Sequence, residues 1–375
     1  MKQHLAFSLF FFSVLYSNAQ ISNVQEEFAL PNGLSESSGA IYVDKKLVTH
    51  NDSGGQNELY EVTLDTETIS RTVTISNATN VDWEDIAQDD TYIYIGDFGN
   101  NNGTRTDLKI YKILKSDFTS STSVTAEVIN FSYADQSDFT SNPQNTVWDA
   151  EALISLNANE LVLISKNWVD GISSAYVISK TPGTYAISAQ PITLSTGGLI
   201  TGATFNELSN KLFLSGYTQT LSPFVWVCED FTGSTIFSGT NTQTMLSSLG
   251  LEQIEGITQT SVNEYLITSE SFSFMVGSIP FADNAKVVSF ATSDTTLSAP
   301  EERESIVTLY PNPVSNRLHI QCENLSNVEV FNLQSALLFS GNIKQVNMNK
   351  FSAGIYLVKV NFNNKMSVIE RVVKR

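Results

Sequence analysis

The sequence predicts an all-β protein: a five-bladed β-propeller followed by a small C-terminal β-sandwich. Between residues 30 and 300, strand-like runs recur about every ten residues with Gly, Asn, Asp and Ser between them, and long amphipathic helical patterns are missing. One unit of two strands repeats five times in this region. The composition changes near residue 304, and a second group of strand-like runs follows.

The first 19 residues are predicted to be a secretory signal peptide. Lys2 precedes an apolar run over residues 5–16, and Ala19 ends a small-residue cleavage pattern. No other stretch approaches the roughly 20 apolar residues of a membrane-spanning helix, so no membrane span is expected. The three His and two Cys are too few for a zinc cluster or a disulfide framework.

The charge is unevenly distributed along the chain. The whole sequence has a net charge of −18, with 39 acidic and 21 basic residues, which disfavours nucleic acid as a partner. Residues 21–302 contain 35 acidic and 11 basic side chains, whereas residues 304–375 contain four acidic and eight basic ones. We therefore expect two domains of opposite charge, in a protein that is a monomer.

Each repeated unit consists of a short polar mark, a strand, a turn and a second, apolar strand. The marks begin 46, 67, 50 and 54 residues apart, close to the ~40–50 residues of propeller blades, so a propeller is predicted over residues 20–298. Val24–Leu30 is expected to complete the last blade and close the ring. A two-sheet sandwich is the alternative, because turn spacing alone does not separate the two folds. The marks begin at Ser38, Glu84, Glu151, Thr201 and Glu255.

The five mark residues are predicted to form a ring of oxygen side chains in the central channel. Three carboxylates in a narrow passage repel one another unless a proton or a cation neutralises them. Oxygen ligands favour calcium, whereas zinc and copper prefer His or Cys. The predicted metal ligands are therefore Ser38, Glu84, Glu151, Thr201 and Glu255. The alternative is that each Glu accepts hydrogen bonds from a neighbouring backbone and only fixes the channel.

Loops after the second strands are expected to lie at the channel mouth, where a rigid scaffold carries functional groups. The candidate catalytic residues are Asp52, Asp97, Arg105 and Lys166. The candidate binding residues are His50, Asn100, Asn101, Trp168, Tyr217 and Glu270. Turn formation in a Gly-rich context is the alternative explanation for Asp52, Asp97 and Asn100–Asn102.

The predicted linker, residues 299–305, precedes a C-terminal domain over residues 306–375. This domain contains Tyr310-Pro311-Asn312-Pro313, then Leu318-His319-Ile320, then a strand that begins at Gly354 and includes Tyr356, and it ends in Lys374-Arg375. The combination resembles the C-terminal sorting domain of the type IX secretion system of Bacteroidetes. The resemblance implies export through the periplasm by the type IX secretion machinery, as a secreted or surface protein.

The order and spacing of the marks resemble those of the calcium-activated nucleotidases, the soluble five-bladed apyrases, with Thr201 where that family has Ser. They also resemble related extracytoplasmic propellers. We expect a secreted, calcium-binding module for an extracellular glycan, peptide or small molecule. The alternative is a calcium-dependent apyrase-like phosphohydrolase or another hydrolase. In it, Glu84, Glu151 and Glu255 hold the metal, Asp52 or Asp97 orients water, and Arg105 and Lys166 steady the leaving group.

Overall fold

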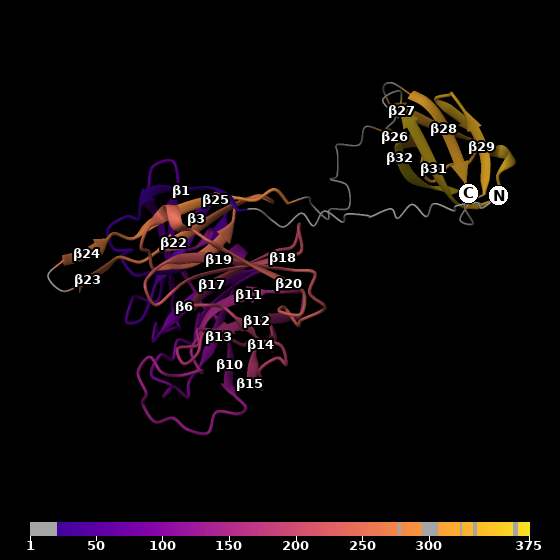
Figure 1. Cartoon of the computed structure of the whole chain (residues 1–375). Coiled ribbons are helices and arrows are strands. Elements are labelled where there is room, and N and C mark those ends of the chain that lie inside the picture. The colour runs from indigo at the N-terminus through magenta and orange to yellow at the C-terminus, as the bar shows by residue number, and fades with distance from the viewer. Residues whose placement is uncertain (1–20, 277–278, 295–306, 323–324, 333–335, 363–366) are drawn as a thin grey trace, which may run out of the picture. The chain divides into compact units, whose positions relative to one another are not determined.

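The computed structural model describes residues 21–276, 279–294, 307–322, 325–332, 336–362 and 367–375. The chain divides into two compact units, residues 1–297 and 298–375 (Figure 1). Nearly all regular structure is β-strand, so the all-β prediction is confirmed. The predicted signal peptide and linker lie outside the described residues.

The first unit contains five sheets, each with one of the marked strands at one edge. The first sheet is β2 (Ser37–Val43), β3 (Lys46–Asn51), β4 (Glu58–Thr63), β5 (Thr68–Ile75) and β9 (Ser123–Val124). The second is β6 (Trp83–Gln88), β7 (Tyr92–Asp97), β8 (Lys109–Leu114), β10 (Glu127–Tyr133) and β15 (Gly183–Ile187). The third is β11 (Ala150–Ser155), β12 (Glu160–Ser165) and β14 (Ala175–Ser179).

The fourth sheet is β17 (Leu199–Asn206), β18 (Lys211–Tyr217), β19 (Pro223–Glu229) and β20 (Thr240–Met245). The fifth is β21 (Ile254–Gln259), β22 (Glu264–Ser269), β25 (Lys286–Ala291) and β1 (Ser22–Ala29). Two short pairs stand outside these sheets: β13 (Ile172–Ser173) with β16 (Leu194–Ser195), and β23 (Phe272–Val276) with β24 (Ile279–Asp283). The helical segments of this unit are α1 (Lys115–Ser120) and η1 (Ser247–Leu249).

The marked strands contact one another in cyclic order. β2 contacts β6, β6 contacts β11, β11 contacts β17, β17 contacts β21, and β21 contacts β2. As the sequence predicts, the N-terminal strand completes the last sheet, because β1 pairs with β25. The third sheet departs from the expected four strands, since β15 pairs in parallel with β10 of the second sheet instead.

A separate hydrophobic cluster fills each interface between consecutive sheets. The cluster between the fifth and first sheets contains Leu266 and Val287 together with Leu47 and Val62. Each marked strand therefore has neighbours on both faces, and every residue of β11 is buried. Burial on both faces fixes where the marked side chains point.

Every marked strand is irregular at its mark. The pairing register shifts between Ser37 and Ala40, Trp83 and Ile86, Ala150 and Ala152, Ile200 and Gly202, and Ile254 and Ile257. Such a bulge redirects side chains and removes backbone groups from the ladder. One buried carboxylate, that of Asp85, accepts hydrogen bonds from N–H groups of three of these edge strands: Ile86 at 2.8 Å, Leu153 at 2.8 Å and Ala203 at 3.1 Å.

The second unit contains two antiparallel sheets around one core. One sheet is β26 (Val307–Tyr310), β27 (Arg317–Cys322) and β30 (Gln345–Asn347). The other is β29 (Leu337–Gly341), β28 (Leu325–Phe331), β31 (Gly354–Phe362) and β32 (Ser367–Lys374), and a short helix, η2 (Met348–Lys350), follows β30. Leu318 and Ile320 of β27 belong to the same buried cluster as Val328 of β28 and Val358 of β31.

Candidate functional site

Acidic side chains gather where the marked strands begin. One carboxylate oxygen each from Asp52, Asp82 and Glu84 lies within 4.8 Å of the others. Further carboxylates interact electrostatically with these three, and together they form what we call the acidic cluster. Its members are Asp52, Asp82, Glu84, Asp149, Glu151, Glu255 and Glu270.

The segment that carries Asp82 and Glu84 is fixed by backbone hydrogen bonds. The N–H of Asp82 donates to Asp97 Oδ1 at 3.2 Å, and the N–H of Trp83 donates to Asn80 Oδ1 at 3.1 Å. A Cβ added at Gly99 would overlap the side chains of both Asp82 and Glu84. Glycine at position 99 therefore provides the space in which these two carboxylates approach each other.

A buried lysine lies among the glutamates. Lys166 Nζ is 3.1 Å from Glu151 Oε1, and both side chains are less than a tenth exposed. Burial alone would lower the pKa of Lys166, but Glu151, Tyr217, Glu255 and Glu84 raise it well above its ordinary value. Lys166 therefore stays protonated and supplies a permanent positive charge to the acidic cluster.

One ammonium cannot neutralise the whole acidic cluster. Burial, followed by repulsion from Asp52 and Glu151, raises the pKa of Glu84 well above its ordinary value. The side chain of Glu151 hydrogen-bonds those of Glu84 and Asp149, and contacts between carboxyl groups require a shared proton or a cation. Glu255 Oε2 is buried without a hydrogen-bond partner among the described residues. The acidic cluster therefore needs protons or a cation in addition to Lys166 to neutralise its negative charge.

The five predicted ring members divide into two groups. Glu84, Glu151 and Glu255 come together around Lys166. The hydroxyl of Ser38 donates to the carbonyl of Glu84, and the hydroxyl of Thr201 donates to the carbonyl of Ile254 at 2.6 Å. These two hydroxyls join one marked strand to the next.

Two of the four candidate catalytic residues, Asp97 and Arg105, contact the backbone segments that carry the acidic cluster. Arg105 Nη2 is 2.8 Å from Asp97 Oδ1, and Asp97 is fully buried. Arg105 also pairs with Asp107 and donates to the carbonyl of Gly99 at 3.0 Å. Asp97 and Arg105 therefore hold the Asp82 segment and the Gly99 loop in place. Of the other two candidates, Asp52 belongs to the acidic cluster, and Lys166 forms an ion pair with Glu151 of that cluster.

The candidate binding residues occupy different environments. His50 is fully buried with its ring edge against Trp83, and burial lowers its pKa to about 4, so it lies in the core rather than at the mouth. Asn100 is buried and donates from its backbone N–H to Asp149 Oδ1 at 2.6 Å, whereas Asn101 is exposed. Glu270 belongs to the acidic cluster.

The two aromatic candidates lie beside Lys166. The Lys166 ammonium is 5.0 Å from the centre of the Trp168 ring and 5.8 Å from that of Tyr217. Trp168 Nε1 donates to Asp149 Oδ2 at 2.6 Å, and the side chain is partly exposed. Tyr217 is buried. Trp168 is thus the aromatic group that a ligand at the mouth would reach first.

Sequence reasoning missed Asp82, Asp149 and Asp85. Asp82 and Asp149 each precede a marked Glu by two residues, as Asp82-Trp83-Glu84 and Asp149-Ala150-Glu151. Residues two apart in a strand point to the same side, so a repeated Asp-x-Glu pattern was an available signal. Asp85 lacks any such signal, because its three hydrogen-bond donors come from three different strands.

The cation-free protein is expected to lose stability as the pH rises from about 6.5 to about 8.5, above the range in which the buried His50 has the opposite effect. Burial, then Asp52 and Glu36, raise the pKa of Glu270 to about 8 against the opposing effect of Lys166. Because this folded-state pKa exceeds the ordinary value of 4.5, the stabilisation is complete below that value and is lost as the pH rises through about 8. Scanning calorimetry across this range measures the effect.

A matched pair of variants isolates Glu270 in this experiment. Glu270→Gln is expected to reduce the fall in melting temperature with pH, whereas Asp135→Asn, the same change at an exposed position, is expected to leave it unchanged. An unchanged slope in Glu270→Gln would contradict the assignment.

In the second unit, the predicted sorting motif forms a fixed turn. Asn312 Nδ2 donates to the carbonyl of Arg371 at 2.8 Å, and Asn312 Oδ1 accepts from the N–H of Val373 at 2.9 Å. The Tyr310 ring stacks on His319 with centroids 5.2 Å apart. Tyr356 is mostly buried and donates to the carbonyl of Ser352 at 2.8 Å, whereas a side chain at Gly354 would meet open space.

Residues 308–375 match the family described as "Secretion system C-terminal sorting domain". The C-terminal unit is such a sorting domain. It indicates export by the type IX secretion system to the cell surface or the extracellular space. None of the curated proteins with which the sequence was compared matches it. Among the described residues, no helix has the length and apolar character needed to cross a bilayer.

Several solved structures resemble the chain at low sequence identity. The β-propeller domain of Cps50 (Swd1) from Myceliophteria thermophila is 9% identical, with 95% of this chain and 100% of that chain covered and a TM-score of 0.32. The WD40 domain of Toxoplasma gondii coronin is 8% identical, with coverages of 75% and 88% and a TM-score of 0.33. The Malassezia sympodialis allergen Mala s 1 is 8% identical, with coverages of 74% and 96% and a TM-score of 0.36. Scores this low do not establish a common fold.

Proposed function

We propose that the first unit is a five-bladed β-propeller, that the second is a small β-sandwich, and that the protein is an exported, calcium-dependent ligand-binding module. The cyclic contacts of β2, β6, β11, β17 and β21 support the propeller. The five interface clusters support it independently, because one of them joins the last sheet to the first. The second unit has two sheets around a single core, which supports the sandwich.

The approach of Asp52, Asp82 and Glu84 to within 4.8 Å of one another carries the calcium proposal. These side chains offer only oxygen, which suits a cation that takes about six to eight oxygen ligands in loose geometry. The site is displaced from the predicted five-residue ring toward Asp52 and Asp82, because the Lys166 ammonium already lies at Glu151. The bound ion would supply the positive charge that the buried carboxyl groups otherwise obtain from protons.

The surface around the acidic cluster supports ligand binding. Trp168 is partly exposed beside Lys166, and Asn101 is exposed on the loop after β7. The hairpin of β23 and β24 extends from the first unit (Figure 1) and carries Phe274 and Met275, which are 36% and 60% exposed. Aromatic and polar groups together suit an extracellular glycan, peptide or small molecule.

The hydrolase alternative has less support. Stabilising a leaving phosphate requires free cationic groups. Arg105 is paired with Asp97 and Asp107, and Lys166 is paired with Glu151. Both candidate cations are therefore committed to carboxylates of the protein itself.

Titration calorimetry with calcium chloride is expected to show one binding site in the purified protein. At 100 times the dissociation constant, calcium should add about 2.7 kcal/mol to the free energy of unfolding. The double variant Asp82→Asn/Glu84→Gln is expected to abolish both the heat and the stabilisation, because it removes two of the three converging carboxylates. Asp135→Asn, at an exposed position, is the matched control and should behave like the parent. Equal calcium responses in the double variant and the parent would refute the site.

A further inference from the structure

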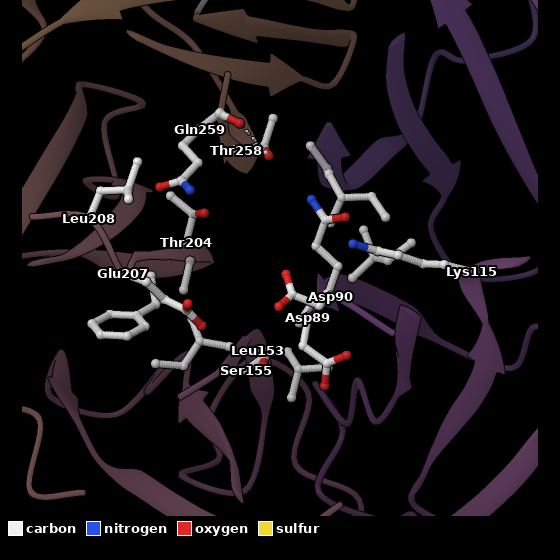
Figure 2. Close-up of a pocket in the computed structure, with 18 residues that line it drawn as sticks. Asp89, Asp90, Lys115, Leu153, Ser155, Thr204, Glu207, Leu208, Thr258 and Gln259 are labelled. Atoms are coloured by element: carbon white, nitrogen blue, oxygen red, sulfur yellow. Dashed lines mark hydrogen bonds between the residues drawn. The ribbon is translucent and has the colours of Figure 1, made fainter. Parts of the chain in front are cut away.

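A cavity lies at the other end of the marked strands from the acidic cluster. It has a volume of about 230 Å³ and is lined by the later residues of these strands, including Ile41, Gln88, Leu153 and Gln259 (Figure 2). This volume is below the roughly 300–1,000 Å³ of pockets for drug-sized ligands, so the cavity suits a smaller molecule.

The inner end of this pocket is fixed by the strands themselves. Ile86, Leu153 and Ala203 line it, and the N–H groups of the same three residues bind the buried carboxylate of Asp85. Because Asp85 ties three strands together there, the walls are held in place before any ligand arrives.

Charges of both signs line the pocket outside any ion pair, and two of them, Asp90 and Glu207, are exposed. Figure 2 shows Lys115 on one side and Glu207 on the other, with Asp90 between them. No ion pair found among the described residues involves any of these three. Burial lowers the pKa of Lys115 against the opposing effect of Asp89, Asp90 and Asp44, so a partner for its charge would relieve an unfavourable state.

Two glutamines add hydrogen-bond acceptors to the lining. Gln88 and Gln259 each carry a buried amide oxygen that no donor of the described chain satisfies. Asp89 is different, because it already binds Lys180 at 2.7 Å and Tyr94 at 2.8 Å. Lys115 can therefore take an anionic group, the two buried amide oxygens can accept N–H donors, and the exposed carboxylates of Asp90 and Glu207 can pair with a cationic group.

We propose that this pocket binds a free α-amino acid as a zwitterion, with its carboxylate at Lys115 and its ammonium at Asp90 and Glu207. The apolar wall residues Ile41 and Leu153 would contact an aliphatic side chain. A simple amine would leave Lys115 unpaired, and a simple carboxylate would meet two acidic groups. A ligand with both charges can pair with Lys115 and with the two carboxylates at the same time.

Titration calorimetry with three related probes tests this proposal: L-leucine, 3-methylbutylamine, which lacks the carboxylate, and 4-methylpentanoate, which lacks the ammonium. L-leucine is expected to bind at least about tenfold more tightly than either analogue, since each charge-assisted hydrogen bond contributes about that factor. Lys115→Met is expected to reduce leucine affinity at least about tenfold and leave the amine unaffected. Glu207→Gln should weaken both leucine and the amine.

Two outcomes would overturn the proposal. One is the absence of leucine binding at millimolar concentration, and the other is equal affinity for leucine and the amine in both the parent and Lys115→Met. Lys350→Met, an exposed lysine of the second unit, is the control and should bind leucine like the parent. Circular dichroism of each variant separates lost binding from lost folding. The pocket shares no lining residue with the Asp52, Asp82 and Glu84 site, so leucine is expected to bind equally with and without calcium, and a failure of one site leaves the other untouched.

Discussion

Replacing Asp85 with alanine is expected to lower the free energy of unfolding by about 3–9 kcal/mol, which is a large part of the stability of an ordinary domain. The carboxylate of Asp85 accepts from the backbone N–H groups of Ile86, Leu153 and Ala203. These donors belong to β6, β11 and β17, which are edge strands of their sheets, and each donor lies at or just after the register shift of its strand. Without Asp85, three buried donors lose their acceptor at about 1–3 kcal/mol each.

Chemical denaturation followed by tryptophan fluorescence measures this loss. Asp85→Asn keeps the volume but replaces one acceptor oxygen with a donor, so it is expected to be less stable than the parent and more stable than Asp85→Ala. Asp135→Ala, at an exposed site, should change stability by no more than about 0.5 kcal/mol. If Asp85→Ala unfolds within about 1 kcal/mol of the parent, Asp85 does not hold the strands together.

The repeated unit could be predicted from the sequence because side chains alternate along a strand every two residues, so a few residues are enough to recognise each strand. The marked strands begin within two residues of the predicted positions, as β6 at Trp83 and β21 at Ile254 illustrate. The pairing of β1 with β25 agrees with the prediction that Val24–Leu30 adds a strand to the last unit. The pairing of β15 with β10 did not follow, because a parallel pair between neighbouring sheets depends on tertiary packing and not on local pattern.

The candidate site could be predicted only in part from the sequence. The interpretation assigned one inward side chain to each mark, although Asp82 and Asp149 lie immediately before β6 and β11 and two residues before a marked Glu. Both residues join Glu84 and Glu151 in the acidic cluster. The hydroxyls of Ser38 and Thr201 donate to the carbonyls of neighbouring strands. The local sequence around Lys166 also does not indicate that its side chain would be buried in an ion pair with Glu151.

Lys166→Met is expected to lower the stability of the cation-free protein by about 3–5 kcal/mol and, at the same time, to raise its calcium affinity at least tenfold. Methionine keeps an unbranched, apolar side chain of similar size but removes the ammonium, together with its contacts with the Trp168 and Tyr217 rings. Glu151 and its neighbours then lose their internal counter-ion, so an external cation gains a more negative site without a competing charge. Calcium titration calorimetry, together with denaturation in the presence and absence of calcium, measures both effects.

Lys180→Met separates the charge effect from the general cost of breaking a buried ion pair. Lys180 is also buried and lies 2.7 Å from Asp89, which lines the pocket at the other end of the marked strands. This control is therefore expected to lose stability with its calcium affinity unchanged. An unchanged or weaker calcium affinity in Lys166→Met would show that the ammonium and the metal do not compete for the same carboxylates. The calcium site would then have to lie away from Glu151, and the stability loss alone would describe an ordinary buried ion pair.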